Sequence, residues 1–130
     1  MIVVHGQTPS HKNSKQIFRT MNGRTILANN KKYLAWKRGA EIEALNQAKR
    51  EYTDGVEIEM TFFIKDKRPR DLDNMVASVL DVLVEANVIV DDNCFVVRGM
   101  HANFGGIDRT NPRAEVEICD LGKLNEIEDL

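Results

Sequence analysis

Hydrophobic and polar residues alternate most regularly at residues 56–64, where the sequence reads VEIEMTFFI. A period of two is typical of a β-strand that buries one face. We therefore expect a half-buried strand at Val56–Ile64, covered by helices. Its inward side chains are expected to be Val56, Ile58, Met60, Phe62 and Ile64. Shorter apolar runs predict five further strands at Ile2–His5, Ile17–Thr20, Arg24–Ala28, Phe95–Asn103 and Arg113–Cys119.

Two other segments show helical spacing. Asn29 or Asn30 can cap a helix that begins near Lys31 and runs to about Tyr52. Its buried face is expected to carry Leu34, Ile42, Leu45 and Ala48, with Lys37, Arg38, Glu41 and Lys49 opposite. A more regular stripe predicts a second helix at Leu72–Ala86. The stripe consists of Leu72, Met75, Val76, Val79, Leu80 and Leu83.

This order of elements predicts an α+β fold in which a mixed β-sheet packs against two main helices. A chain of 130 residues fits one domain, so residues 1–130 are expected to form a single domain. Its acidic tail, residues 121–130, is expected to be frayed or lightly helical. No apolar run approaches the ~20 residues of a membrane span, and the N-terminus lacks the basic region of a signal peptide. Two isolated cysteines fit reduced thiols in a cytoplasmic protein.

Charge is distributed unevenly along the chain, although the net charge is only −2. Residues 1–70 contain 14 Lys and Arg against 7 Asp and Glu, whereas residues 71–130 contain 4 against 13. Such asymmetry indicates nucleic-acid contact, or else basic and acidic faces that neutralise each other. A metal-dependent phosphodiesterase would also need such a basic half and such an acidic half. Its basic residues would bind phosphates, and its carboxylates would bind the metal ion.

The candidate chemistry lies at the two ends of the second helix. Asp71 comes directly before it, Asp73 falls in its first turn beside the amide of Asn74, and Asp91 and Asp92 follow it. Either aspartate at the start could be a helix cap, and the later pair could be a solvated turn. A helix from Asp73 to Asn87 is about 21 Å long, and the five residues from Asn87 to Asp92 span about 16 Å when extended. The Asp92 side chain therefore reaches Asp73 only if the chain turns back directly along the helix. Otherwise it would complete a partner chain's site.

Three carboxylates around one point would need a cation, and hard oxygen ligands suit Mg²⁺. Other candidates are weaker. His5, His11 and His101 lack the spacing of metal ligands, which favours structural or surface roles. Tyr33 and Trp36 lie near several lysines, where they would either stack on bases or belong to the core.

The run R-P-R-D-L-D-N at residues 68–74, followed by a helix containing Asp81 and by V-D-D at residues 90–92, resembles the RusA family of Holliday junction resolvases. The loop T-P-S-H-K-N at residues 8–13 is similar to that family's early P-S-x-N segment. The resemblance covers about residues 5–118. It implies an intertwined homodimer that uses Mg²⁺, or Mn²⁺ in its place, to make paired nicks in branched DNA. It also implies a role in DNA recombination and repair, often from a prophage, with no small-molecule cofactor and no membrane partner.

Carried over by position, Asp71, Asp73 and Asp92 become the catalytic and metal-binding carboxylates, with Asn74 and Asp91 in support. The residues expected to contact DNA are Lys12, Asn13, Lys15, Arg19, Arg24, Lys31, Lys32, Lys67, Arg68 and Arg70. One departure stands out, because the family usually has a lysine on the catalytic helix where this chain has Ala77. We expect Lys67, Arg68 or Arg70 to substitute for it. The alternatives are a junction-binding protein without catalysis and an ordinary domain with solvated acids.

Overall fold

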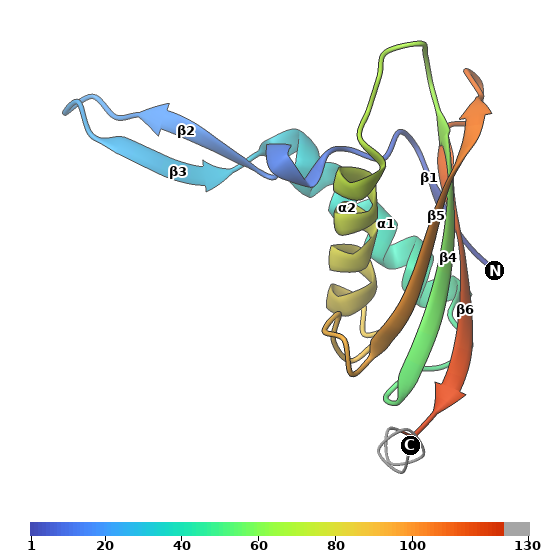
Figure 1. Cartoon of the computed structure of the whole chain (residues 1–130). Coiled ribbons are helices and arrows are strands. Elements are labelled where there is room, and N and C mark those ends of the chain that lie inside the picture. Colours follow the sequence, from blue (N-terminus) through green and yellow to red (C-terminus); the bar gives the residue numbers. More distant parts are fainter. Residues whose placement is uncertain (124–130) are drawn as a thin grey trace.

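The computed structural model describes residues 1–123, and residues 124–130, most of the predicted acidic tail, lie outside the described residues. Its elements run in the order strand, short 3₁₀ helix, hairpin, helix, strand, helix and two strands (Figure 1). They are β1 (Ile2–His5), η1 (His11–Asn13), β2 (Lys15–Arg19), β3 (Thr25–Asn29), α1 (Lys31–Gln47), β4 (Gly55–Ile64), α2 (Leu72–Glu85), β5 (Val97–Ile107) and β6 (Arg113–Gly122).

The main sheet has four strands in the order β1-β6-β4-β5. β4 is antiparallel to β6 and parallel to β5, and β1 is antiparallel to β6, so the sheet is mixed. Both long helices lie on the same face of this sheet (Figure 1). The predicted α+β fold, a mixed sheet against two main helices, is therefore confirmed.

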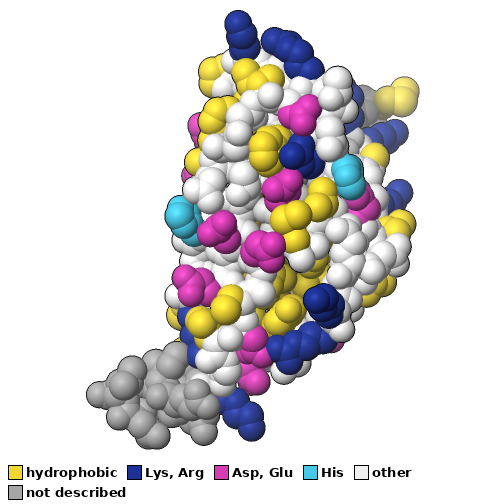
Figure 2. Space-filling model, turned by 90° about the vertical axis from the view of Figure 1, so that its right-hand side faces the viewer, with side chains coloured by type: hydrophobic (Ala, Val, Ile, Leu, Met, Phe, Trp, Pro, Cys, Tyr) yellow, Lys and Arg dark blue, Asp and Glu magenta, His cyan; other side chains and the backbone are white. Residues whose placement is uncertain are grey.

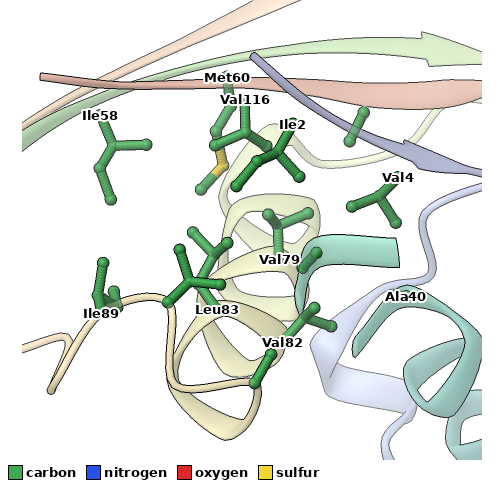
Figure 3. Close-up of a cluster of buried hydrophobic side chains, with 14 of the residues drawn as sticks. Ile2, Val4, Ala40, Ile58, Met60, Val79, Val82, Leu83, Ile89 and Val116 are labelled. Atoms are coloured by element: carbon green, nitrogen blue, oxygen red, sulfur yellow. The ribbon is translucent and has the colours of Figure 1, made fainter. Parts of the chain in front are cut away.

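The core lies between the helices and the sheet, as the alternation in β4 predicts. All five inward side chains of β4 are buried, and Ala114 and Val116 of β6 join them. Val79, Val82 and Leu83 of α2 fill the space beneath the sheet (Figure 3). The predicted strand at residues 56–64 and the stripe of the second helix are thus confirmed.

The first helix differs from its prediction in length and in its buried face. α1 ends at Gln47 rather than near Tyr52, because the Tyr52 backbone pairs with the segment after α2. Ile42 and Leu45 are both 62% exposed, so assigning them to the buried face was wrong. The buried residues of α1 are Tyr33, Ala40 and Ala44. Small alanines permit close approach of the backbone, and apolar residues on α1 are too scattered to define one face.

The last two strands are longer than predicted. β5 begins at Val97 and extends through two glycines to Ile107, past the predicted end at Asn103. A Cβ atom at Gly105 would lie 2.7 Å from the Phe63 ring, so this glycine admits the strand beside an aromatic neighbour on β4. β6 continues to Gly122, which places the first two residues of the predicted tail in a strand.

The hairpin β2–β3 projects away from the rest of the molecule (Figure 1). Every residue of β2 is exposed, and β3 is exposed except for half-buried Ala28. The arm nevertheless carries large apolar side chains, namely Ile17, Phe18, Met21, Ile26 and Leu27. A two-stranded hairpin is at best marginally stable by itself in water. These side chains therefore form an uncovered apolar surface on the arm.

The sheet face opposite the helices is acidic. Glu57 and Glu59 of β4 and Glu115 and Glu117 of β6 lie on this face, where the register places Glu59 directly beside Glu117. Figure 2 shows acidic side chains gathered over the middle of this side of the molecule. Such a surface repels phosphate, so a polyanionic ligand is expected to approach another side.

Candidate active site

Asp71 lies at the junction between the β4–α2 loop and α2. It is the N-cap residue and has extended backbone angles, φ −82° and ψ 125°, but its side chain makes no capping hydrogen bond. Instead, its Oδ2 atom accepts a hydrogen bond of 3.3 Å from Nδ2 of Asn74, whose side chain is buried. Capping therefore does not explain this carboxylate, which is held by Asn74 and remains exposed.

Asp73 lies in the first turn of α2, as predicted. Its Oδ1 atom accepts a hydrogen bond of 2.9 Å from the backbone N–H of Asn74. The negative charge also complements the positive end of the helix dipole. Asn74 thus binds both carboxylates, one through its side chain and one through its backbone. The supporting role expected for Asn74 in catalysis stays a prediction.

A loop from the N-terminal part of the chain, residues 6–14, closes over this end of α2. Three contacts fix the loop. Oε1 of Gln7 accepts a 2.9 Å hydrogen bond from the backbone N–H of Lys65, and Oγ of Ser78 donates one of 2.7 Å to the Pro9 carbonyl. The ring of His11 packs edge-on against Tyr33, with centroids 5.9 Å apart. The loop is therefore held by β4, α2 and α1 at once.

Between this loop and the β4–α2 loop lies a pocket of about 320 Å³. Lys12, Asn13, Arg68, Asp71 and Asn74 are among its lining residues. Nζ of Lys12 lies 3.8 Å from Oδ2 of Asp71. The pocket thus brings predicted DNA-contacting residues together with one predicted catalytic carboxylate.

A second hollow of about 550 Å³ opens on the other side of the loop. Its cations are Lys15, Lys32, Lys65 and Arg68. Lys65 was missed in the sequence, although its place directly after the buried strand β4 indicated a loop residue. Four cations around one hollow can hold phosphate groups.

The two aromatic residues that were candidates for base stacking mainly pack in the interior. Tyr33 is buried, and its hydroxyl donates a 3.3 Å hydrogen bond to Oδ2 of Asp81. Burial, together with the negative charge of Asp81, raises the pKa of Tyr33 to about 12. Trp36 packs partly against the core. For Tyr33 the structure thus favours the core alternative.

Asp81 also joins the two helices through Lys37, whose Nζ lies 3.2 Å from Oδ2 of Asp81. Lys37 was assigned to the solvent face of its helix, but its side chain is only 18% exposed. The sequence does contain an indication of this ion pair, because Asp81 is a charged residue within the otherwise apolar sequence of α2. Ser78, the other polar residue inside that sequence, likewise marks a tertiary contact.

Arg70 was expected to contact DNA, but its guanidinium is directed toward the protein. Its Nη1 atom lies 2.8 Å from Oδ1 of Asp66 and donates to the Arg68 carbonyl oxygen. The hydrogen bond from Arg70 lowers the pKa of Asp66 to about 2, with a further contribution from the Arg68 backbone N–H. This pair shapes the loop that leads into Asp71.

Asp91 and Asp92 follow the C-terminal end of α2, whereas Asp71 lies at its N-terminal end. The chain does not return along the helix, because Val88 and Val90 make backbone hydrogen bonds of 2.8 and 3.0 Å with Tyr52. Asp91 accepts bonds from the Asp92 backbone and the Asn93 side chain, which stabilise the turn. Among residues 1–123, no three His, Cys, Asp or Glu side chains are grouped closely enough to hold a metal ion.

The remaining predicted DNA contacts are exposed at separate places. Arg19 and Arg24 belong to the projecting hairpin, Lys31 begins α1, and Lys67 lies in the β4–α2 loop.

Cys94 and Cys119 are both exposed free thiols. In the part of the chain that the structure describes, no helix has the length and apolar character needed to cross a membrane.

Comparison with known proteins identifies one family. The family model of endodeoxyribonuclease RusA matches residues 8–119, which span the N-terminal loop, both helices and most of the sheet. No curated protein matches the chain significantly.

Proposed function

Because the chain belongs to the RusA endodeoxyribonuclease family, we propose that it is a Mg²⁺-dependent, structure-selective endonuclease that makes paired nicks in four-way DNA junctions. The observation that carries this proposal is the position of Asp71. Its carboxylate occupies a helix N-cap without capping the helix, and it faces a pocket lined by cations. A carboxylate beside phosphate-binding groups is the arrangement that metal-assisted phosphodiester hydrolysis requires.

The residues at this end of α2 fit a hard divalent cation. Asp71 and Asp73 offer exposed carboxylate oxygens, and Mg²⁺ is commonly bound by one or two carboxylates together with waters and a substrate phosphate. When bound, Mg²⁺ or Mn²⁺ would polarise the phosphoryl group and lower the pKa of a coordinated water. The protein's own part is to hold these two carboxylates in place through Asn74 and the anchored loop.

We further propose that Asp92 completes the site of a partner subunit. Within one chain, α2 separates it from Asp71 by about 20 Å, since 14 helical residues rise by that length. A two-fold homodimer would bring the end of one α2 toward the start of the other and would give two sites for two nicks. The uncovered apolar surface of the β2–β3 arm supports an intertwined dimer, because a partner would bury it.

DNA is proposed to bind the side of the molecule that carries the two pockets. Phosphates would be held by the loop and α1 lysines together with Arg68, while the hairpin cations would reach further along a branch. The acidic outer sheet face is unsuited to DNA. By family membership, the substrate would be a recombination or repair intermediate in the cytoplasm of a bacterium, as encoded by many prophages.

A cleavage assay tests the activity. A labelled four-way junction incubated with the protein and Mg²⁺ should give nicked duplexes, and EDTA should prevent this. Asp71→Asn, Asp73→Asn and Asp92→Asn should each abolish cleavage and still bind the junction. Cleavage by Asp73→Asn at the wild-type rate would disprove the assignment.

Mixed dimers test the contribution of Asp92 from the partner subunit. Asp73→Asn and Asp92→Asn are each inactive alone, but a mixed dimer with sites formed across the interface has one intact site. An equal mixture that exchanges subunits should therefore recover about a quarter of the wild-type sites, as single nicks. If no activity returns once subunits have exchanged, each site is built from one chain.

One observation favours a second function, a junction-binding protein without catalysis. Position 77 of α2 is an alanine, although the family usually has a lysine there. This alternative predicts that the junction is retarded in a gel with Mg²⁺ but stays intact.

A further inference from the structure

We propose that Lys12 is a catalytic residue, which supplies the positive charge that faces the scissile phosphate. This inference rests on the proposed nuclease function. Nζ of Lys12 lies 3.8 Å from Oδ2 of Asp71. Within residues 1–123, it is the only Lys or Arg nitrogen inside 4 Å of either Asp71 or Asp73. A group that contacts this carboxylate would also contact a phosphate held beside it.

Neighbouring cations are less suited to this role. Arg70 is the closest in sequence, but it is engaged by Asp66 and its side chain is only 16% exposed. Arg68 lines both pockets and makes no ion pair with either carboxylate among the described residues. Lys67 borders a different, more apolar hollow, together with Phe104 and Ile107. The expected substitutes for the missing helix lysine are therefore less well placed than Lys12.

Stability does not explain the position of Lys12. The side chains of Lys12 and Asp71 are 71% and 70% exposed, and ion pairs this exposed add little to the free energy of unfolding. The loop around Lys12 is instead fixed by other contacts. The backbone of η1 turns through hydrogen bonds of 3.0 Å from Asn13 to Ser10 and from Ser14 to His11, and Ser78 anchors Pro9. An anchored backbone holds an exposed lysine where a ligand would meet it.

The same pocket contains a second sign of a missing ligand. Thr8 lines it and is 3% exposed, and its hydroxyl oxygen has no hydrogen-bond partner in the described part of the chain. Buried polar groups are rarely left without a partner. A phosphate oxygen or an ordered water in the pocket would satisfy this hydroxyl.

The proposed role of Lys12 is electrostatic and involves no proton transfer from its side chain. In hydrolysis, a water oxygen forms a bond to phosphorus and gives its proton to solvent, while negative charge grows on the phosphoryl oxygens. The ester bond to the sugar oxygen breaks, and the leaving sugar oxygen takes up a proton from solvent. The Lys12 ammonium group would stabilise this charge through a hydrogen bond and keep its own proton. Removing one such preorganised donor commonly slows a reaction by about 10²–10³-fold.

Single-turnover cleavage at saturating protein tests the role of Lys12. Lys12→Ala should cleave about 100-fold more slowly. Its affinity for the junction in EDTA, followed by fluorescence anisotropy, should weaken less than about tenfold, as for one lost phosphate contact. Lys12→Arg, which keeps the charge, should recover at least part of the rate. Lys49→Ala, an exposed lysine away from both pockets, is the matched control and should behave as wild type.

A metal titration gives a readout that is independent of activity. Because Lys12 neutralises part of the charge on Asp71, Lys12→Ala should bind Mn²⁺ at least about fivefold more tightly, since two unit charges about 4 Å apart in water already interact by that factor. Circular dichroism melting curves confirm that each variant is folded.

The outcomes separate the two proposals. A wild-type protein that does not cleave overturns the proposed function and this inference with it. An active wild type with an equally fast Lys12→Ala at saturation overturns the inference alone, as does a Lys12→Arg variant no faster than Lys12→Ala. Unchanged Mn²⁺ affinity would contradict the contact between Lys12 and the metal-binding carboxylate.

Discussion

The hydroxyl of Ser78 donates a 2.7 Å hydrogen bond to the carbonyl oxygen of Pro9 and so ties the middle of α2 to a loop 69 residues earlier in the chain. Ser78 is fully buried. The bond fixes Pro9 of the loop against α2.

Ser78→Ala should therefore loosen the loop as well as lower stability. Losing the donor leaves the half-buried Pro9 carbonyl without this partner, which costs about 1–2 kcal/mol in free energy of unfolding, measured by urea denaturation. Cleavage should slow because Lys12 is no longer held over Asp71. Ser10→Ala is the control, since the Ser10 side chain makes no capping bond. Equal stability of the two variants would contradict the anchoring role.

Restoring a lysine on α2 should compensate for loss of Lys12. Residues 73 and 77 are four apart and share a helix face, and side chains on a helix lean toward its N-terminus. Ala77→Lys in the Lys12→Ala background should thus recover cleavage by about tenfold. The measurement is the single-turnover rate, with Ala77→Gln as a control of similar size without charge. A rate no higher than that of the glutamine control would contradict this prediction.

Asp66 should titrate near pH 2. Its pKa is lowered because Arg70 donates to its carboxylate. A lowered pKa in the folded state means that the pair adds stability above pH 3.8, and that this stability is lost as the pH falls toward 2. NMR titration of the carboxyl carbon should show the low midpoint, and Arg70→Gln should move it back toward 3.8. An unchanged midpoint in Arg70→Gln would show that Arg70 is not the cause.

Lys37→Met should loosen the contact between the two helices. Nζ of Lys37 lies 3.2 Å from Asp81, which is only 32% exposed and would keep its charge with one partner fewer. We expect a loss of about 1–2 kcal/mol in the free energy of unfolding, measured in urea. Arg38→Met, at an exposed neighbouring position, should change it by less than about 0.5 kcal/mol.

Replacing residues 16–28 with a short Gly-Ser linker should leave the body of the protein folded. The hairpin contributes no buried side chain, and Ser14 and Asn30 at its base are already joined by a 2.8 Å backbone hydrogen bond. The melting temperature should thus change little, while light scattering should show a monomer. Arg19→Ala with Arg24→Ala keeps the apolar surface and should remain dimeric, with weaker DNA binding. A dimeric deletion variant would place the interface elsewhere.

The sequence predicted best those elements whose pattern reflects a single environment. β4 alternates because one face meets the helices, and α2 has one apolar stripe because it lies against the sheet. α1 was less predictable, since it packs through Ala40 and Ala44 and sets Lys37 against Asp81, so its hydrophobic residues do not mark the buried face.

The candidate site was predictable in part for a similar reason. Asp71 and Asp73 are separated by one residue in sequence, so local spacing was enough to place them at the start of α2. The loop carrying Lys12 reaches the site through Ser78 and Gln7, and no periodicity records such a tertiary contact. The position of Asp92 depends on backbone pairing with Tyr52, which the helix length alone could not reveal.

The separation of charge between the outer sheet face and the pocket side has a consequence before any contact forms. Glutamates on one side and lysines on the other give the molecule a dipole moment, and the field of a DNA branch exerts a torque on it during approach. Random collisions would then more often begin with the pocket side facing the DNA. This bias fades as added salt shortens the range of the field.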